Sequence, residues 1–318
     1  MEYINPITKL PLKESETGLS DSAGNFFPKT NGIYRFVESS GYTGNFGYQW
    51  KTFKRTQLDK FSGTNLSKER FFSVTNWDKE SLAGKNILEA GSGAGRFTQI
   101  VLDYTQANLF SFDYSEAVDA NMENNGPHPR LHLFQASIYE MPFPENSFDK
   151  VYCFGVLQHT PDVKKSIECL YKVLKPGGEL IIDFYPYNGF WTKLNAKYLL
   201  RPYLNNLGTE KLHAMISKNI SWMIAATGFF TRIKIGRLVN RFIPIVDISS
   251  TFPKNLSKDE LKQWAILDTF DMFSPAYDQP QKKEDIKYYF LQLGMKEVVS
   301  KTVIYNQNSG VTFCRGIK

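Results

Sequence analysis

The stretch NILEAGSGAGR at residues 86–96 decides the fold. Its first half is a short apolar run, which predicts a buried strand, and its second half alternates glycine with small residues. The pattern that follows is helical up to residue 104. Because glycine has no Cβ and the first turn of a helix leaves N–H groups unpaired, this order lets the backbone approach a ligand closely. The stretch therefore predicts a ligand-binding loop at the end of a strand.

Strands and helices alternate from this stretch onward. We expect strands at 86–90, 108–112, 131–135, 150–156 and 179–185, with helices at 96–104 and 163–174. This alternation predicts an α/β fold with a doubly wound, Rossmann-like sheet. It stops over residues 187–281 and resumes with a helix at 283–293 and strand-like runs at 298–305 and 311–315, which predict a C-terminal antiparallel hairpin.

The chain divides into predicted parts on this basis. We expect a small β-rich unit at 1–38, a linker and N-terminal helices at 39–84, a core at 85–186 and 282–318, and a helical lid inserted after the fifth strand at 187–281. Within the second part, Ser67 is the expected start of a helix, since acidic Glu69 follows in the first turn.

Composition excludes several classes of protein. With 42% hydrophobic residues among 318, the chain is not a disordered one. Three cysteines without a CxxC pair cannot form a disulfide framework or a four-cysteine zinc site. Residues 1–16 show no secretory signal pattern, and the mid-chain run 219–231 is too short to span a bilayer. We therefore expect a cytoplasmic protein, with peripheral contact to a membrane as an open alternative.

The glycine loop distinguishes two kinds of cofactor. A dinucleotide fingerprint requires glycine at its first, third and sixth positions. Counted from Gly91, the sixth position is Arg96, which is too bulky for the close packing of helix on strand that the third glycine permits. The spacing therefore argues against a nicotinamide-dependent oxidoreductase.

The pattern ExGxGxG at 89–95 resembles the first motif of the class I S-adenosylmethionine-dependent methyltransferases. Further matches cover residues 85–186: Asp113 after the second strand, EMPF at 140–143 with SFD at 147–149, LQHTPD at 157–162 and LKPGG at 174–178. The resemblance implies a transferase that carries out methylation with S-adenosyl-L-methionine as its cofactor.

Outer segments extend the resemblance to a subgroup. FGYQW at 46–50 with TQLD at 56–59, and FDMFSPAY at 270–277, are similar to enzymes often associated with surface-glycan or natural-product biosynthesis. LPL at 10–12 and NGIYRFV at 31–37 are similar to a small zinc-ribbon domain, but its cysteines are absent, so we expect no metal. The implied acceptor is a hydroxyl or amine of a sugar or biosynthetic small molecule.

The resemblance implies a set of cofactor contacts. Ser137 is the weakest of them, since family members commonly carry an acid at the end of the third strand. The set is Glu89, Gly91, Ser92, Gly93, Gly95, Arg96, Asp113, Tyr114, Ser137, Ile138 and Phe154.

Catalytic and substrate residues are expected near the carboxyl ends of the strands. In-line methyl transfer needs the acceptor held in attack geometry, which can supply up to about 7–11 kcal/mol, and a hydroxyl acceptor also needs a base. His159, after the fourth strand, is the expected base; holding its loop by hydrogen bonds is the alternative. Alternation places Asp183, Tyr185 and Tyr187 on one side of the fifth strand. The expected catalytic residues are His159, Asp183 and Tyr185, and the expected substrate residues are Tyr187, Asp271, Tyr277, Gln49 and Trp50.

The net charge of +6 is concentrated at residues 190–244. Nine cations oppose the single acid Glu210 there, so this segment carries +8 and the rest of the chain −2. The cations are Lys193, Lys197, Arg201, Lys211, Lys218, Arg232, Lys234, Arg237 and Arg241. Three interpretations stay open: a solvated basic face, cations that meet an anionic substrate, and docking on a membrane surface to reach a lipid-linked substrate. Without a recognised module we expect no nucleic acid partner.

The sequence thus predicts an S-adenosylmethionine-dependent methyltransferase. Two alternatives remain. One is a catalytically silent methyltransferase-like binding module, with residues 1–38 as a contact to a partner. The other, less favoured, is the nicotinamide-dependent oxidoreductase. The oligomeric state is not predicted.

Overall fold

A computed structural model of the chain describes residues 1–37, 41–233, 236–246, 256–306 and 309–318. Within these ranges twelve strands form one mixed sheet, in the order β1-β2-β3-β4-β5-β8-β7-β6-β9-β10-β12-β11. Neighbours from β5 to β10 pair in parallel, and β12 pairs antiparallel with both β10 and β11. The strands are β1 (Tyr3–Ile4), β2 (Pro11–Glu14), β3 (Gly18–Ser20), β4 (Phe26–Thr30), β5 (Ile33–Arg35), β6 (Asn86–Ala90), β7 (Asn108–Asp113), β8 (Leu131–Gln135), β9 (Phe148–Cys153), β10 (Leu174–Asp183), β11 (Lys296–Tyr305) and β12 (Ser309–Ile317).

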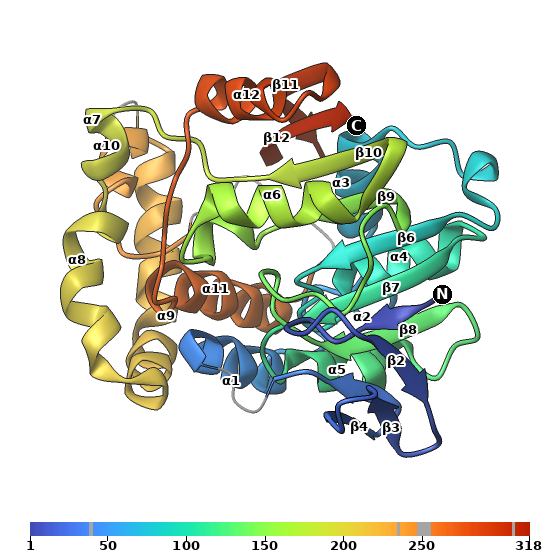
Figure 1. Ribbon diagram of the computed structural model, residues 1–318. Helices are drawn as coiled ribbons and strands as arrows, with labels where there is room; N and C mark the ends of the chain where they lie inside the picture. The colour runs from blue at the N-terminus through green and yellow to red at the C-terminus, as the bar shows by residue number, and fades with distance from the viewer. Residues whose placement is uncertain (38–40, 234–235, 247–255, 307–308) are drawn as a thin grey trace.

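Helices cover both faces of this sheet (Figure 1). They are α1 (Gly44–Thr52), α2 (Asp59–Ser62), α3 (Leu66–Thr75), α4 (Arg96–Tyr104), α5 (Ala117–Asn125), α6 (Val163–Val173), α7 (Phe190–Lys193), α8 (Ala196–Leu204), α9 (Thr209–Thr231), α10 (Gly236–Asn240), α11 (Lys258–Phe273) and α12 (Lys283–Gln292). The predicted α/β class of fold is therefore confirmed. None of the described helices combines the length and the apolar character needed to cross a bilayer.

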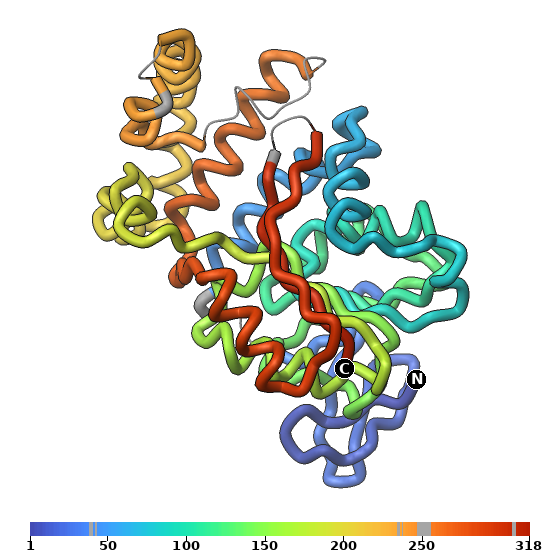
Figure 2. Tube along the Cα trace, turned by 90° about the horizontal axis from the view of Figure 1, so that it is seen from above, coloured from blue at the N-terminus to red at the C-terminus, as the bar shows by residue number. Residues whose placement is uncertain are grey.

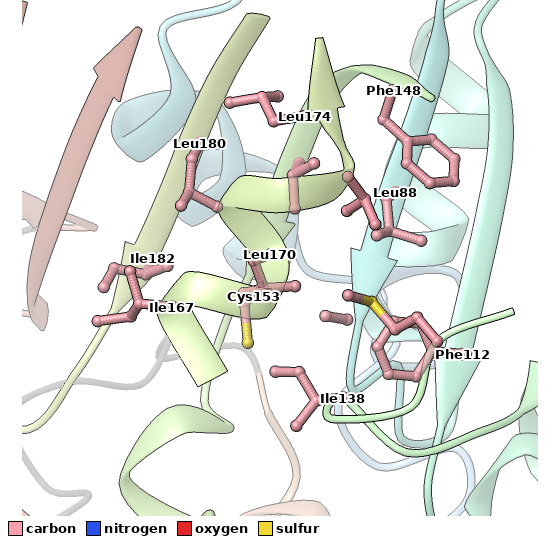
Figure 3. Close-up of a cluster of buried hydrophobic side chains, with 14 of the residues drawn as sticks. Leu88, Phe112, Ile138, Phe148, Cys153, Ile167, Leu170, Leu174, Leu180 and Ile182 are labelled. Atoms are coloured by element: carbon pink, nitrogen blue, oxygen red, sulfur yellow. The ribbon is translucent and has the colours of Figure 1, made fainter. Parts of the chain in front are cut away.

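Alternate residues of the central strands face opposite layers of helices, as the period of a strand requires. Leu88 on β6 and Ile182 on β10 belong to the cluster that contains α6 and α12, and Figure 3 shows both with Ile167 of α6. Their neighbours Ile87 and Ile181 belong to the cluster that contains α3 and α4. The core therefore has two layers, one on each side of the sheet.

Residues 187–281, which we call the lid segment, contain α7 to α11. Figures 1 and 2 show these helices gathered at one end of the sheet, toward which β6 and β10 point. The segment has an apolar cluster of its own, in which Ile216 and Ile220 of α9 pack with Phe270 of α11. Phe53, just after α1, belongs to the same cluster, so α1 and the lid segment are packed together.

The N-terminal strands differ from the separate unit that the sequence suggested. β5 pairs in parallel with β8, with Tyr34 opposite Phe134, so these strands extend the main sheet. The Tyr34 ring lies 5.6 Å from the ring of Phe134, and Tyr3 and Leu19 join the same core cluster. The expected boundary at residue 38 lies outside the described residues.

Two element boundaries differ from the prediction. The helix expected to start at Ser67 starts one residue earlier, at Leu66, and the Asp59 carboxylate accepts the N–H groups of Ser67 and Lys68 in its first turn at 3.0 and 2.9 Å. The strand expected at 179–185 is β10, which ends at Asp183. Tyr185 and Tyr187 therefore lie beyond it, and strand alternation does not fix the side to which they point.

Candidate active site

A cavity of about 940 Å³ lies at the carboxyl ends of the parallel strands. Ligands of open α/β sheets bind at this edge, and the volume is within the range of small-molecule sites. Strand-end loops line one side, and α1, α8 and α11 line the other. Helices of the lid segment therefore line part of a cavity whose base is the strand ends of the sheet.

The glycine loop after β6 forms part of this base. Gly91 and Gly93 have φ angles of 78° and 51°, a region that favours glycine. A Cβ at Gly91 would lie 2.2 Å from Val156 Cγ2, and one at Gly93 would lie 3.0 Å from Trp50 Nε1. Any side chain would therefore fill this part of the cavity, so the loop is shaped to present its backbone.

Asp113 ends the neighbouring strand β7 and also lines the cavity. Its Oδ2 accepts the Gly93 N–H at 2.8 Å, and its Oδ1 accepts the N–H and the hydroxyl of Ser115 at 2.8 and 2.7 Å. Burial raises the pKa of Asp113. A carboxylate oxygen has two lone pairs, so Oδ2 keeps one acceptor position for a ligand hydroxyl.

Glu89 lies beneath the glycine loop and is not among the residues that line the cavity. It is 2% exposed, and its Oε2 accepts hydrogen bonds from Thr98 and, at 2.7 Å, from Ser111. Burial raises the pKa of Glu89 to about 7. Its contacts connect β6 to α4 and β7.

The other residues expected at the cofactor fall into two groups. Neither Gly95 nor Ser137 lines the cavity: a Cβ at Gly95 would lie 2.1 Å from Asn125 Nδ2, and Ser137 Oγ accepts the Tyr139 N–H at 3.2 Å. Gly95 thus packs against α5, and Ser137 bonds within its own loop. Those that line the cavity are Ser92, Arg96, Tyr114, Ile138 and Phe154.

His159 lines the cavity from the turn Leu157–His159 that follows β9. Its Nδ1 lies 2.9 Å from the carbonyl oxygen of Tyr277, and a carbonyl can only accept. Nδ1 therefore carries the proton and Nε2 carries the lone pair. Nε2 is buried without a hydrogen-bond partner among the described residues, and burial lowers the pKa of His159. The imidazole is therefore neutral at neutral pH, and its Nδ1–H is fixed by the Tyr277 carbonyl.

Asp183 lines the cavity, but its carboxylate is already engaged. Arg70 Nη2 donates to Oδ2 in an ion pair, and the Gly155 N–H donates to Oδ1 at 2.5 Å. Burial alone would lower the pKa of Arg70, but the Asp183 charge raises it. A carboxylate held by arginine is a poor base, so this pairing argues against the catalytic role expected for Asp183. Arg70 was not identified as a site residue from the sequence.

Tyr185 and Asp271 meet on the wall of the cavity. Tyr185 Oη donates to Asp271 Oδ2 and Gln49 Nε2 donates to Oδ1, both at 3.4 Å. Burial raises the pKa of Tyr185, so its phenol stays protonated and acts as a donor, not as a base. Trp50 also lines the cavity, against Gly93. Four expected residues are thus brought together from α1, α11 and the end of β10.

Tyr187 and Tyr277 do not line the cavity. The Tyr187 N–H donates to the Gln281 carbonyl at 2.8 Å, which joins the two ends of the lid segment. Tyr277 contributes through its carbonyl, which orients His159. Neither side chain is therefore positioned as a substrate contact.

The lid segment adds polar residues that the sequence did not single out. Asp268 stands one turn before Asp271 on α11, and burial and the Asp271 charge raise its pKa to about 7. Lys197 on α8 lies 2.8 Å from the Asp278 carboxylate and 4.5 Å from the centre of the Tyr185 ring. Lys197 was counted as one cation of nine, and only its place on the inner side of α8 distinguishes it.

Metal ligands do not gather in the described part of the chain, where no group of three or more His, Cys, Asp or Glu side chains could hold an ion. The three cysteines, Cys153, Cys169 and Cys314, are free thiols.

Residues 88–182 match the sequence profile of a family described as "Methyltransferase domain". The matched range begins in β6 and ends in β10. It therefore contains the glycine loop, Asp113 and His159, and excludes the lid segment and the N-terminal strands.

Similar proteins match this same region. A probable S-adenosylmethionine-dependent methyltransferase of Mycolicibacterium smegmatis is 31% identical over 32% of this chain and 38% of its own length. A sterol 24-C-methyltransferase of Pneumocystis carinii is 31% identical over 41% of this chain and 36% of its own. The chain thus spans well under two thirds of these relatives. A provisionally assigned S-adenosyl-L-methionine-dependent methyltransferase structure from Methanococcus maripaludis has a TM-score of 0.45 and 13% identity, over 89% of this chain and 95% of that one.

Proposed function

Because residues 88–182 belong to the S-adenosylmethionine-dependent methyltransferase family, we propose that the whole chain transfers a methyl group from this cofactor to a hydroxyl or amine acceptor. The acceptor in this proposal is a sugar or another biosynthetic small molecule. We assign cofactor binding to residues 85–186 and 282–318, and closure over the acceptor to the lid segment.

The observation that carries the proposal is the contact between Gly93 and Asp113 at the base of the cavity. Two loops that follow adjacent strands meet there, one presenting bare backbone and the other a carboxylate with a free acceptor position. A nucleoside with ribose hydroxyls fits this donor and acceptor set, by analogy with the ribose carboxylate of dinucleotide sites. Ser92, Tyr114, Ile138 and Phe154 would complete the surface around it.

The bound cofactor would supply an electrophilic methyl group. Residues of this chain would orient the acceptor, exclude water and take up the proton. Gln49, Trp50 and Asp271 would exclude water and orient the acceptor against the strand ends. For a hydroxyl acceptor, His159 Nε2 would take the proton, because the Tyr277 carbonyl keeps the ring in the tautomer with its lone pair at that atom. Asp183 would hold Arg70 and the Gly155 loop in place and take no proton.

The polar groups on the lid side support a polar acceptor. Lys197, Asp268 and Asp271 line the cavity, and burying these charged side chains against an entirely apolar molecule would cost free energy. Relatives with this domain are named for sterol, quinone and phosphoethanolamine acceptors, so the domain itself does not select the acceptor. We place the protein in the cytoplasm as part of the same proposal.

A methyl-release assay tests the proposal. S-adenosylhomocysteine formation is measured with nucleotide-sugars, polyprenyl-linked sugars and small biosynthetic amines and alcohols as acceptors. Turnover with one class, lost in His159→Gln or Asp113→Ala, supports the enzyme. Tight S-adenosylhomocysteine binding without turnover on any acceptor would instead favour the silent binding module.

A further inference from the structure

The outer surface of the lid segment is unusually apolar. Most of the exposed large hydrophobic side chains of the described residues lie there. Phe190, Trp191 and Phe229 are 71%, 58% and 62% exposed. Soluble proteins seldom leave such side chains in contiguous groups, and a contiguous group marks an interaction surface. We define the lid tip as Phe190, Trp191, Phe229, Ile233, Leu238 and Phe242.

Contacts between α7, the end of α9 and α10 hold these residues at one end of the lid segment. The Arg241 guanidinium lies 6.0 Å from the centre of the Trp191 ring, and its Nε donates to the Leu194 carbonyl. Asn240 at the end of α10 donates to Thr231 Oγ1 at the end of α9, at 2.9 Å. Figure 1 shows α7 and α10 close together at the upper left, far from the N-terminal strands β2 to β4 at the lower right. The lid tip is therefore one surface built from three elements.

Cations accompany this surface. Lys193 follows Trp191 on α7, and Arg232 follows α9; both are exposed. On α9 itself the exposed positions share one helix face, which begins with Lys211 and Lys218 and continues to Trp222 and the lid tip. Lys234 lies outside the described residues, as does the side chain of Arg237. Between residues 190 and 244 the single acid is Glu210, so apolar and positive groups adjoin without compensation.

Three other cations of this segment point inward. Lys197 pairs with Asp278, and Arg201 donates to the Met272 carbonyl at 3.2 Å. Arg241 donates to the Leu194 carbonyl. They hold the lid segment together, and only Lys197 lines the cavity. The exposed cations are consequently the ones that could meet an external partner.

We propose that the lid tip docks into the interface of an anionic lipid bilayer. Aromatic side chains prefer the interfacial layer of a membrane, and neighbouring cations are attracted to its negative surface. A second copy of this chain would bring the same positive charges together, which charge complementarity disfavours. This proposal concerns a surface outside the cavity and does not depend on the proposed function.

Vesicle co-sedimentation tests the docking with the full chain. The probes are vesicles of phosphatidylcholine alone and vesicles that contain about a quarter phosphatidylserine, at low and at raised salt. We expect binding to the anionic vesicles to be at least about tenfold stronger and to weaken with salt. The variant Phe190→Ser/Trp191→Ser should lose most of the binding to anionic vesicles. The variant Lys193→Glu/Arg232→Glu should lose the binding that the unchanged protein shows to these vesicles at low salt.

The matched control is Tyr288→Ser/Leu291→Ser on α12, a helix outside the lid segment; these two side chains are 63% and 50% exposed. It should bind vesicles as the unchanged protein does. Thermal melting of all variants checks that they fold. Absence of binding to anionic vesicles, or an equal loss in the control, would overturn the proposal. The proposal would also be overturned if the unchanged protein is a dimer by light scattering, the Phe190→Ser/Trp191→Ser variant is a monomer, and neither binds vesicles. Activity of the enzyme enters none of these readouts, so failure of the docking is distinct from failure of the proposed function.

Discussion

Arg70 on α3 donates to the Asp183 carboxylate at the end of β10, and this ion pair joins the N-terminal helices to the sheet at the edge of the cavity. The two side chains are 18% and 4% exposed. Such a buried pair contributes less through its own attraction than through the cost of leaving either charge without its partner.

Arg70→Met should therefore destabilise the fold by about 3–5 kcal/mol, because it leaves Asp183 charged and buried with only the Gly155 N–H. Urea denaturation measures this change. Lys51→Met is the matched control, since Lys51 pairs with Glu116 on the surface, where both side chains are more than half exposed. It should cost less than about 1 kcal/mol. Equal effects of the two substitutions would contradict the positioning role of the buried pair.

Glu89 predicts a pH dependence of stability. Folding raises its pKa from 4.5 to about 7, so the stability that its protonated form provides is complete below the lower value and is lost as the pH rises through the higher one. Glu89→Gln keeps an acceptor for Thr98 and Ser111. At about pH 8 it should raise the free energy of unfolding by up to about 3 kcal/mol, and near pH 4 the difference should disappear.

The same variant separates two roles for Glu89. If Glu89 only positions the loop, Glu89→Gln should change S-adenosylhomocysteine affinity by less than about threefold. A large loss of affinity in a variant that remains folded would instead restore the direct cofactor contact expected from the sequence.

Gly91→Ala should weaken cofactor binding. The added Cβ would lie 2.2 Å from Val156 Cγ2 at a φ of 78°, so the loop must move from its position in the cavity. We expect at least about tenfold weaker S-adenosylhomocysteine binding by calorimetry. Gly84→Ala is the control: its φ is 69° with nothing within 4 Å of the new Cβ, so it should lower stability by about 1–2 kcal/mol and leave affinity unchanged. If Gly91→Ala binds normally, the loop does not cradle the cofactor.

His159 predicts the pH profile of the reaction with a hydroxyl acceptor. A base must be unprotonated, and burial lowers the pKa of His159 below its ordinary 6.5. The rate constant should therefore stay level through neutral pH and fall only in more acidic solution. His159→Gln should reduce kcat by about 10²–10⁴-fold with cofactor affinity retained. Full turnover of this variant at every pH would exclude the base.

The sequence predicted the central strands and the glycine loop well, because both are local patterns. The apolar run of β6, the glycines after it and Asp113 after β7 lie close together in the chain, and parallel pairing brings their ends to one edge. The α5 helix was not expected, since Ala117–Asn125 is rich in Asn and has a weak apolar period. The sequence did not predict that Asp59 satisfies the first turn of α3, because seven residues separate Asp59 from Ser67.

The lid side of the site could not be predicted in this way. Arg70 reaches Asp183 across 113 positions, and Tyr277 reaches His159 across 118. Each contact depends on how α3 and the lid segment pack on the sheet, which no local pattern encodes. The contact of Lys197 could not be predicted either. Lys197 points inward whereas Lys193 is exposed, and this difference depends on how α8 packs.

The most direct test of the central claim is a calorimetric titration of the full chain with S-adenosylhomocysteine, repeated with Asp113→Ala and with Asp119→Ala as a control outside the cavity. We expect one binding site with a Kd in the range of about 1–100 μM, with the affinity weakened at least about tenfold by Asp113→Ala and unchanged by Asp119→Ala. NADH should give no heat. An unchanged protein that fails to bind S-adenosylhomocysteine, or that binds it equally well without the Asp113 carboxylate, would contradict the account.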